Sequence, residues 1–215
     1  MKKFFTLIAV AAMALTANAQ KIVFDATAGK QASYEVDGFK MTYVDEDGKA
    51  AVDANSQYFG TADAYENFTA RFKTGAKSGA KSNITLTCPK AGTLKVYARS
   101  ASGSATDRNL ILTQGETELY NKVVKDEDAV KVTIEEVEKN VFPVISVEVA
   151  AGDVAVTYPT GSLNFYGFEL ISGTTGIETV KAAEAEGVKY NMAGQKVGAD
   201  YKGVVIMNGK KMVNK

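Results

Sequence analysis

The sequence predicts an all-β protein: an antiparallel β-sandwich of jelly-roll type, followed by a short C-terminal β-hairpin tail. Short segments alternate large apolar residues with polar ones, the period of two that is typical of half-buried strands. These segments recur at a spacing of roughly 8–12 residues, as in sandwich folds. Turn-forming pairs such as Asp37-Gly38, Gln114-Gly115 and Gly152-Asp153 lie between them. Helical patterns are scarce, and a helical turn is favoured only near Asp63–Asn67.

The strand pattern can be followed along the chain. Its clearest examples are Asn83–Cys88 and Thr93–Arg99, which flank a turn at Pro89–Gly92. The stretch Glu127–Asn140 can also be argued as a helix, but the alternation within Val130–Ile134 favours a strand. The complete set of predicted strands is Lys21–Asp25, Phe39–Val44, Asn83–Cys88, Thr93–Arg99, Asn109–Thr113, Glu118–Val124, Val130–Ile134, Val144–Val149, Val154–Tyr158 and Leu163–Ile171.

Residues 1–19 predict a cleavable secretory signal peptide. Lys2 and Lys3 form a basic start, Phe4–Leu15 is apolar, and Ala17-Asn18-Ala19 is a small-x-small cleavage pattern. Cleavage after Ala19 leaves Gln20 as the new N-terminus. The apolar run is shorter than the roughly 20 residues of a spanning helix, so no transmembrane anchor is expected. The expected location is therefore secreted or at the cell surface, with the periplasm as the alternative, and the export machinery is an expected partner.

Composition excludes several functional classes. The leader holds two of the 25 basic residues and none of the 25 acidic ones, so the remaining chain is slightly acidic. This balance argues against nucleic acid or an anionic membrane as a partner. The single cysteine, Cys88, cannot form an internal disulfide and is expected to be a small buried residue. The absence of histidine excludes Ser-His-Asp and Cys-His hydrolases and His-ligated metals, and no cofactor is expected.

The composition changes after Ile171. Ser172–Gly176 is built of small residues, so we expect a linker over residues 173–187 that separates a sandwich domain (20–172) from a tail (188–215). Two short hairpin-like pieces make up the tail. In the second, Asn208-Gly209 is a strong two-residue hairpin signal.

The tail carries a family resemblance. The sequence Tyr190–Val197, followed by Tyr201–Val213, resembles the end of a type IX (Por) secretion C-terminal sorting domain, found on secreted and surface proteins of Bacteroidetes. The resemblance covers only part of such a domain, whose pattern ends in a strand, a Gly turn and a basic strand. It implies passage across the outer membrane. The alternative is a terminal hairpin that packs on the main domain or stays mobile.

The main domain resembles the jelly-roll modules attached to secreted polysaccharide-acting proteins of such bacteria. The segments that carry this looser resemblance are Ala91–Ser100, Arg108–Leu112 and Leu163–Leu170. They run from a central strand, through an Arg-bearing strand, to a closing aromatic strand. The resemblance implies a carbohydrate-binding role and a polysaccharide or surface glycan as partner.

Candidate ligand-binding residues are those that suit a sugar. Aromatic rings offer flat faces to the C–H side of a pyranose, and guanidinium or amide groups offer paired hydrogen bonds to its hydroxyls. Core packing, or an ordinary solvated sheet face, is the alternative for each of them. Tyr58 and Tyr65 are expected in loops, beside Arg71 and Lys73. The predicted ligand-binding residues are Tyr58, Tyr65, Tyr97, Arg99, Arg108, Asn164 and Tyr166.

Two further readings concern acidic residues. Asp45-Glu46-Asp47-Gly48, with Asp53, offers oxygen ligands to calcium, but a hairpin turn between Met41–Val44 and Ala50–Val52 is favoured. No metal site is therefore predicted. The acids between Asp126 and Glu138 have the pattern of a solvated stretch, and nothing marks out a catalytic pair.

The leading hypothesis is an exported, non-catalytic binding module for glycans. The alternative is a structural or adhesive surface protein without a small-molecule site. A third reading is a carboxylate-dependent glycosidase or lyase, which the missing histidine and the lack of an identifiable acid pair disfavour.

Overall fold

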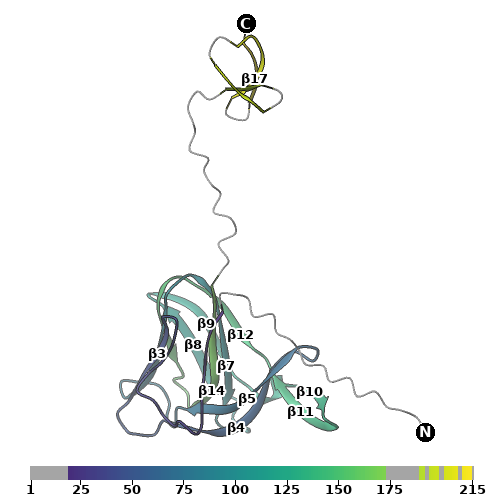
Figure 1. Ribbon diagram of the computed structural model, residues 1–215. Helices are drawn as coiled ribbons and strands as arrows, with labels where there is room; N and C mark the ends of the chain where they lie inside the picture. Colours follow the sequence, from purple (N-terminus) through teal and green to yellow (C-terminus); the bar gives the residue numbers. More distant parts are fainter. Residues whose placement is uncertain (1–18, 173–188, 192–193, 199–200, 208–209, 215) are drawn as a thin grey trace, which may run out of the picture. The chain divides into compact units, whose positions relative to one another are not determined.

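The computed structural model describes residues 19–172, 189–191, 194–198, 201–207 and 210–214 (Figure 1). By its contacts the chain divides into two compact units, residues 1–173 and 174–215. Of the predicted signal peptide (residues 1–19), only Ala19 is among the described residues, and the predicted linker (residues 173–187) lies outside them. Within the described ranges, no helix has the length and apolarity required to cross a membrane.

The first unit is a sandwich of two β-sheets, which confirms the predicted all-β class. An eight-stranded sheet has the order β10-β11-β4-β5-β14-β7-β12, and β1 also pairs with β14. Its strands are β1 (Ala19–Val23), β4 (Ala51–Gly60), β5 (Tyr65–Lys73), β7 (Gly92–Ser100), β10 (Val130–Ile134), β11 (Val137–Phe142), β12 (Ile145–Val149) and β14 (Leu163–Ser172). A six-stranded sheet contains, in order, β2 (Tyr34–Val36), β3 (Phe39–Asp45), β6 (Ser82–Cys88), β13 (Gly152–Thr157), β8 (Asn109–Gln114) and β9 (Thr117–Val123).

The main core lies between the two sheets. Met41 and Leu86 enter it from the six-stranded sheet, and Leu94 and Phe165 enter it from the eight-stranded sheet; all four side chains are fully buried. The alternation of apolar and polar residues that predicted these strands is therefore the alternation between core and outer face. Cys88 belongs to this core with a free thiol, as its strand context predicted.

A bulge in β14 decides which of its aromatic residues enter the core. The register with β7 shifts between Phe165 and Gly167, so one extra residue, Tyr166, is accommodated there. Phe165 and Phe168 therefore both face the core, although they are three positions apart, an offset that puts side chains on opposite faces of a regular strand. Tyr166 lies on the opposite, outer face of the sheet. At Gly167 a Cβ atom would approach the Ile22 carbonyl oxygen of β1 to 2.9 Å, which explains the glycine.

A second cluster of aromatic rings packs on the outer face of the eight-stranded sheet. Its members, here called the outer aromatic cluster, are Phe59, Phe68, Tyr97, Phe142 and Tyr166. The pairing of β4 with β5 also shifts register, between Ala54 and Gln57. Beyond this bulge, Phe59 and Phe68 of the hairpin pack on Tyr97 rather than in the main core.

Several local expectations are wrong. Residues 62–64 form a bend and Tyr65 already begins β5, so there is no helical turn at Asp63–Asn67. The turn at Asp47-Gly48 is present, but it connects β3 of one sheet to β4 of the other and so does not close a hairpin. The Asp45 carboxylate fixes this crossover by accepting hydrogen bonds from the backbone N–H groups of Lys49 and Ala50.

The eight-stranded sheet also contains one pair of parallel strands among the pairs that the structure describes, which departs from the predicted antiparallel arrangement. β11 runs parallel to β4, with Val141 opposite Tyr58 and Phe142 opposite Phe59. This pairing places the β10–β11 hairpin beside the C-terminal end of β4 (Figure 1). Four strands of the sandwich, β2, β4, β5 and β11, are absent from the predicted set.

The second unit contains a four-stranded antiparallel sheet with the order β16-β15-β17-β18. Its strands are β15 (Lys189–Asn191), β16 (Lys196–Val197), β17 (Gly203–Met207) and β18 (Lys210–Asn214). Met207 pairs with Lys210, so the strands of the predicted second hairpin are adjacent. Its turn, Asn208-Gly209, lies outside the described residues.

Candidate functional site

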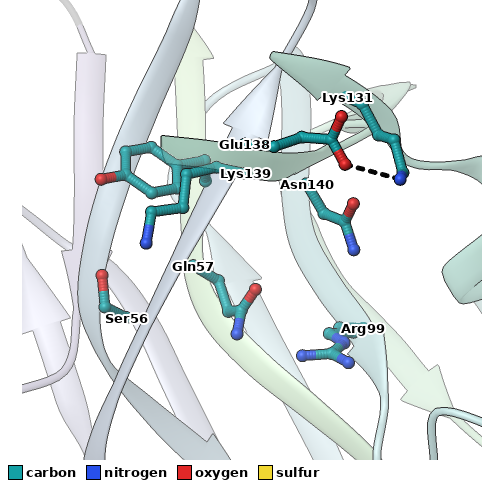
Figure 2. A pocket seen from close by; sticks show the side chains of 8 residues that line it. Ser56, Gln57, Arg99, Lys131, Glu138, Lys139 and Asn140 are labelled. Carbon is teal, nitrogen blue, oxygen red and sulfur yellow. Dashed lines mark hydrogen bonds and ion pairs between the residues drawn. The ribbon is translucent and has the colours of Figure 1, made fainter. Parts of the chain in front are cut away.

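A groove of about 540 Å³ lies at the outer face of the eight-stranded sheet. Arg99 of β7 enters it from the sheet, because its neighbour Ala98 faces the main core. β4 forms one wall and the β10–β11 hairpin forms the other (Figure 2). The lining residues are Ser56, Gln57, Tyr58, Arg99, Lys131, Glu138, Lys139 and Asn140.

Arg99 is fixed at the base of the groove. Its Nε and Nη2 atoms donate hydrogen bonds of 2.7–3.2 Å to the carboxylate of Asp126, in the short 3₁₀ turn before β10. Its guanidinium carbon lies 4.9 Å from the centroid of the Phe142 ring, within the range of a cation–π contact. The hydrogen bond from Arg99 to Asp126 raises the pKa of Arg99, so the guanidinium stays charged.

A polar network lies beneath this base. The Tyr166 hydroxyl donates a 2.6 Å hydrogen bond to Asn55 Oδ1, and the Tyr166 side chain is fully buried. Burial raises the pKa of Tyr166, and the nearby Arg71 and Arg99 guanidinium groups oppose that rise. Arg71 is itself held by Asp53, with 2.8 Å between Nε and Oδ1. The guanidinium groups of Arg71 and Arg99 thus both lie near the buried hydroxyl of Tyr166.

The wall formed by β4 presents one aromatic ring and two polar side chains. Tyr58 is half-buried, and its ring meets the Tyr65 ring edge to face, with centroids 5.8 Å apart. Ser56 donates a hydrogen bond to Asn67 Oδ1 on β5, which orients its hydroxyl. Gln57 directs its amide into the groove between these groups and Arg99 (Figure 2).

The wall formed by the hairpin carries the remaining charges. Lys131 Nζ donates a 2.6 Å hydrogen bond to Glu138, so this exposed pair is neutral as a whole. Lys139 and Asn140 extend from β11 into the same space (Figure 2). Within the part of the chain that the structure describes, Lys139 forms no ion pair.

The structure brings some of the predicted ligand residues to the groove. Tyr58 and Arg99 line it, and Tyr65 supports Tyr58. Tyr58 and Tyr65 lie in β4 and β5, so the expectation that they occupy loops is wrong. Asn164 and Tyr166 lie on the outer face but are covered, with 4% and 0% of their surface exposed.

The other two predicted residues lie elsewhere. Tyr97 shares the outer face with Arg99, but it is buried and its hydroxyl donates to Glu169 at 2.5 Å. Arg108 precedes β8 in the six-stranded sheet and donates to the Thr160 carbonyl oxygen at 3.0 Å. Arg99 and Arg108, both predicted as ligand-binding residues, therefore do not meet in one groove.

Sequence reasoning missed Gln57, Lys139 and Asn140 as groove residues. They sit in polar stretches that have the pattern of solvated strand faces. Only the parallel register of β11 on β4 brings them together, and no local signal encodes that register. Asp126 and Glu138 were expected in a solvated acidic stretch. Glu138 is exposed, as expected, and also lines the groove, whereas Asp126 is mostly covered and holds Arg99.

Among the described residues, no group of three or more acidic or cysteine side chains is placed to hold a metal ion. Asp45, which was weighed as a calcium ligand, instead binds Lys30 at 2.6 Å in addition to the turn backbone. The Asp45–Asp47 segment is therefore a structural turn.

Comparisons with known proteins do not place this chain in a family. No family model matches the sequence, and no curated protein matches it. One solved structure comes from work on the Ruminococcus flavefaciens cellulosome and its expansion in glycan recognition, and its chain is 14% identical to this one. The match covers 71% of this chain and 93% of that chain, with a TM-score of 0.37. The catalytic unit of a GH87 α-1,3-glucanase from Streptomyces thermodiastaticus is 16% identical, with a TM-score of 0.34 over 61% of this chain and 26% of that chain. At this level of similarity neither structure assigns a function to this protein.

Proposed function

We propose that this protein is an exported, non-catalytic module that binds a glycan in the groove between β4, β7 and the β10–β11 hairpin. The observation that carries the proposal is the composition of the groove. One half-buried tyrosine ring, two amides, a hydroxyl and a fixed guanidinium face one open space. Sugars present alternating apolar C–H faces and hydroxyl pairs, and this set matches both.

The size of the groove agrees with a small oligosaccharide. Its volume of about 540 Å³ lies within the range of roughly 300–1,000 Å³ that is usual for ligand sites. Its base is held by the Arg99–Asp126 and Tyr166–Asn55 contacts. The polar groups there are therefore positioned before a ligand arrives, which lowers the entropic cost of binding.

The non-catalytic part of the proposal rests on the acids in the groove. Glycoside hydrolysis generally uses two carboxyl groups about 5–10 Å apart, one on each side of the scissile bond. Among the described residues that line the groove, only Glu138 is acidic, and it is paired with Lys131. The nearby Asp126 carboxylate is occupied by Arg99. The export part rests on the leader pattern of residues 1–19.

The test is glycan binding by the chain from Gln20 to Lys215, measured on a broad glycan array and then by calorimetry. Tyr58→Ala and Asn140→Ala remove one aromatic and one amide contact. Each is expected to weaken binding by about tenfold, equivalent to about 1.4 kcal/mol. Tyr190→Ala removes an exposed tyrosine of the second unit and serves as the matched control, with unchanged affinity.

Two outcomes would contradict the proposal. If no glycan binds above background while the circular dichroism spectrum shows folded protein, the groove is not a glycan site and an adhesive or structural role is favoured. If the protein releases products from a polysaccharide panel, the non-catalytic assignment is wrong.

A further inference from the structure

The groove walls do not carry balanced charge. Three cationic side chains and one carboxylate line the groove. Lys131 is compensated by Glu138 at 2.6 Å, and Arg99 is compensated from outside the groove by Asp126 at 2.7 Å. Lys139 is the one remaining lining charge, since within the described residues no carboxylate pairs with it.

The uncompensated ammonium group of Lys139 lies within the groove, where a ligand can reach it. Its side chain reaches from β11 across the groove towards the wall that carries Ser56 and Gln57 (Figure 2). Arg99 lies at the base, on the other side of Gln57 (Figure 2). An ammonium group and a guanidinium group thus flank a row of hydroxyl and amide groups. The hydroxyls of a neutral sugar can accept hydrogen bonds from this ammonium group, but only an anionic group on a sugar would also neutralise its charge.

We propose that the ligand of the groove is an acidic glycan, one that carries a carboxylate or a sulfate group, and that Lys139 contacts this anionic group. The inference rests on the proposed glycan-binding function and specifies its ligand class. In this arrangement the anionic group meets Lys139, the ring of the same or the next sugar lies against Tyr58, and Gln57 and Asn140 bind hydroxyls. A hydrogen bond between an ammonium and an anion is stronger than one between neutral groups, so Lys139 discriminates between acidic and neutral glycans.

The experiment compares matched polysaccharides on the chain from Gln20 to Lys215. Polygalacturonate and its carboxyl-reduced form differ only in the acid group, and chondroitin sulfate and desulfated chondroitin differ only in sulfate. We expect the carboxylated or the sulfated member to bind at least about fivefold more tightly than its neutral or less charged partner, and addition of salt to reduce the difference. The two pairs separate a carboxylate from a sulfate as the recognised group.

Two variants distinguish a specific contact of Lys139 with the ligand from a general effect of positive charge on the protein surface. Lys139→Gln is expected to remove most of the preference for the acidic member, by weakening its binding more than that of the neutral member. Lys90→Gln, at an exposed lysine in the turn before β7, is the matched control and should keep the preference.

The outcomes distinguish this inference from the proposed function. If neutral and acidic members bind equally, or Lys139→Gln keeps the preference, the acidic-ligand inference is overturned while glycan binding in the groove stands. If neither member of either pair binds and the broad array is also negative, the proposed function fails and this inference fails with it.

Discussion

The hydroxyl of Tyr166 donates a 2.6 Å hydrogen bond to Oδ1 of Asn55, and this contact lies beneath the base of the groove. It joins the bulge residue of β14 to the bulged part of β4. The two irregularities in the sheet are therefore connected directly, and both contribute to the shape of the site.

Tyr166→Phe is expected to lower the free energy of unfolding by about 1 kcal/mol, because Asn55 Oδ1 loses its shorter hydrogen bond and keeps only the 3.4 Å contact from Gln57 Nε2. Urea unfolding followed by fluorescence measures the change. Tyr158→Phe is the matched control, since its buried hydroxyl meets Ser82 Oγ at 3.0 Å. Both variants should lose stability, but only Tyr166→Phe should weaken glycan binding. An equal effect of the two on binding would contradict a positioning role for Tyr166.

The turn of the β10–β11 hairpin stores strain. Ile134 pairs with Val137, and the two residues between them, Glu135 and Glu136, have φ angles of 50° and 63°. Such a two-residue turn favours Asn-Gly, because residues with a Cβ atom are disfavoured at positive φ. Replacing both residues, with Glu135→Asn and Glu136→Gly, is expected to stabilise the protein by about 1 kcal/mol.

Thermal unfolding by calorimetry checks this effect. Glu116→Gly changes a glutamate in the β8–β9 turn that is not at positive φ, so it should give no gain. If the hairpin variants do not raise the midpoint, the strain at this turn is absent in solution.

Asp53 links stability to pH. Hydrogen bonds from the Arg71 side chain lower the pKa of Asp53, and Lys73 adds to the effect. A carboxyl group with a lowered folded-state pKa contributes stability above its unfolded pKa and loses it as pH falls through the folded value. Asp53→Asn is therefore expected to flatten the loss of stability between about pH 5 and pH 3.

Urea midpoints measured across this pH range give the slope. Asp63→Asn, at an exposed residue before β5, should keep the slope of the unmodified protein. A slope for Asp53→Asn equal to that of the unmodified protein would show that the pair with Arg71 contributes nothing.

Cys88 should be unreactive in the folded protein. Burial, with a smaller contribution from Asp153, raises the pKa of its thiol to about 11, and 1% of its surface is exposed. The thiolate is the reactive form, so a thiol reagent at about pH 8 should label the protein only after unfolding. Absorbance on labelling with and without denaturant measures this, and rapid labelling of the native protein would contradict the buried position.

The C-terminal tail is expected to direct export beyond the periplasm. A reporter that carries residues 1–19 at its start and residues 176–215 at its end should reach the surface or medium of a host with type IX secretion. The same reporter with the leader alone is the control and should remain in the periplasm. Immunoblots of cell fractions measure the distribution, and retention of both reporters in the periplasm would end the sorting interpretation.

The strands were predictable where one face is buried. Along Asn83–Cys88 and Thr93–Arg99, alternate side chains enter the main core, and the period of two reports this directly. The sequence signal fails where both faces are partly covered. Phe59 and Phe68 pack on the outer face, so β4 and β5 lack a clean alternation.

The site was less predictable than the fold. Tyr58 and Arg99 could be selected by residue type, but Gln57 and Lys139 became neighbours only through the β11–β4 register. The bulge at Tyr166 likewise puts Phe165 and Phe168 on one face of β14, which the period of two alone does not predict. Register shifts of this kind depend on packing between distant segments, which a single sequence does not encode locally.

The pairing of β1 with β14 also has a consequence for the timing of folding. Residues 19–23 align along residues 167–171, so the first and last strands of the domain are neighbours in one sheet. A chain that emerges from its N-terminus first, from a ribosome or a membrane channel, exposes β1 long before β14 is available. Until then the edges of β7 and β5 that β14 joins stay open. The domain therefore reaches its native state only after its last strand has emerged, and contacts at such long sequence separation make that final step slow.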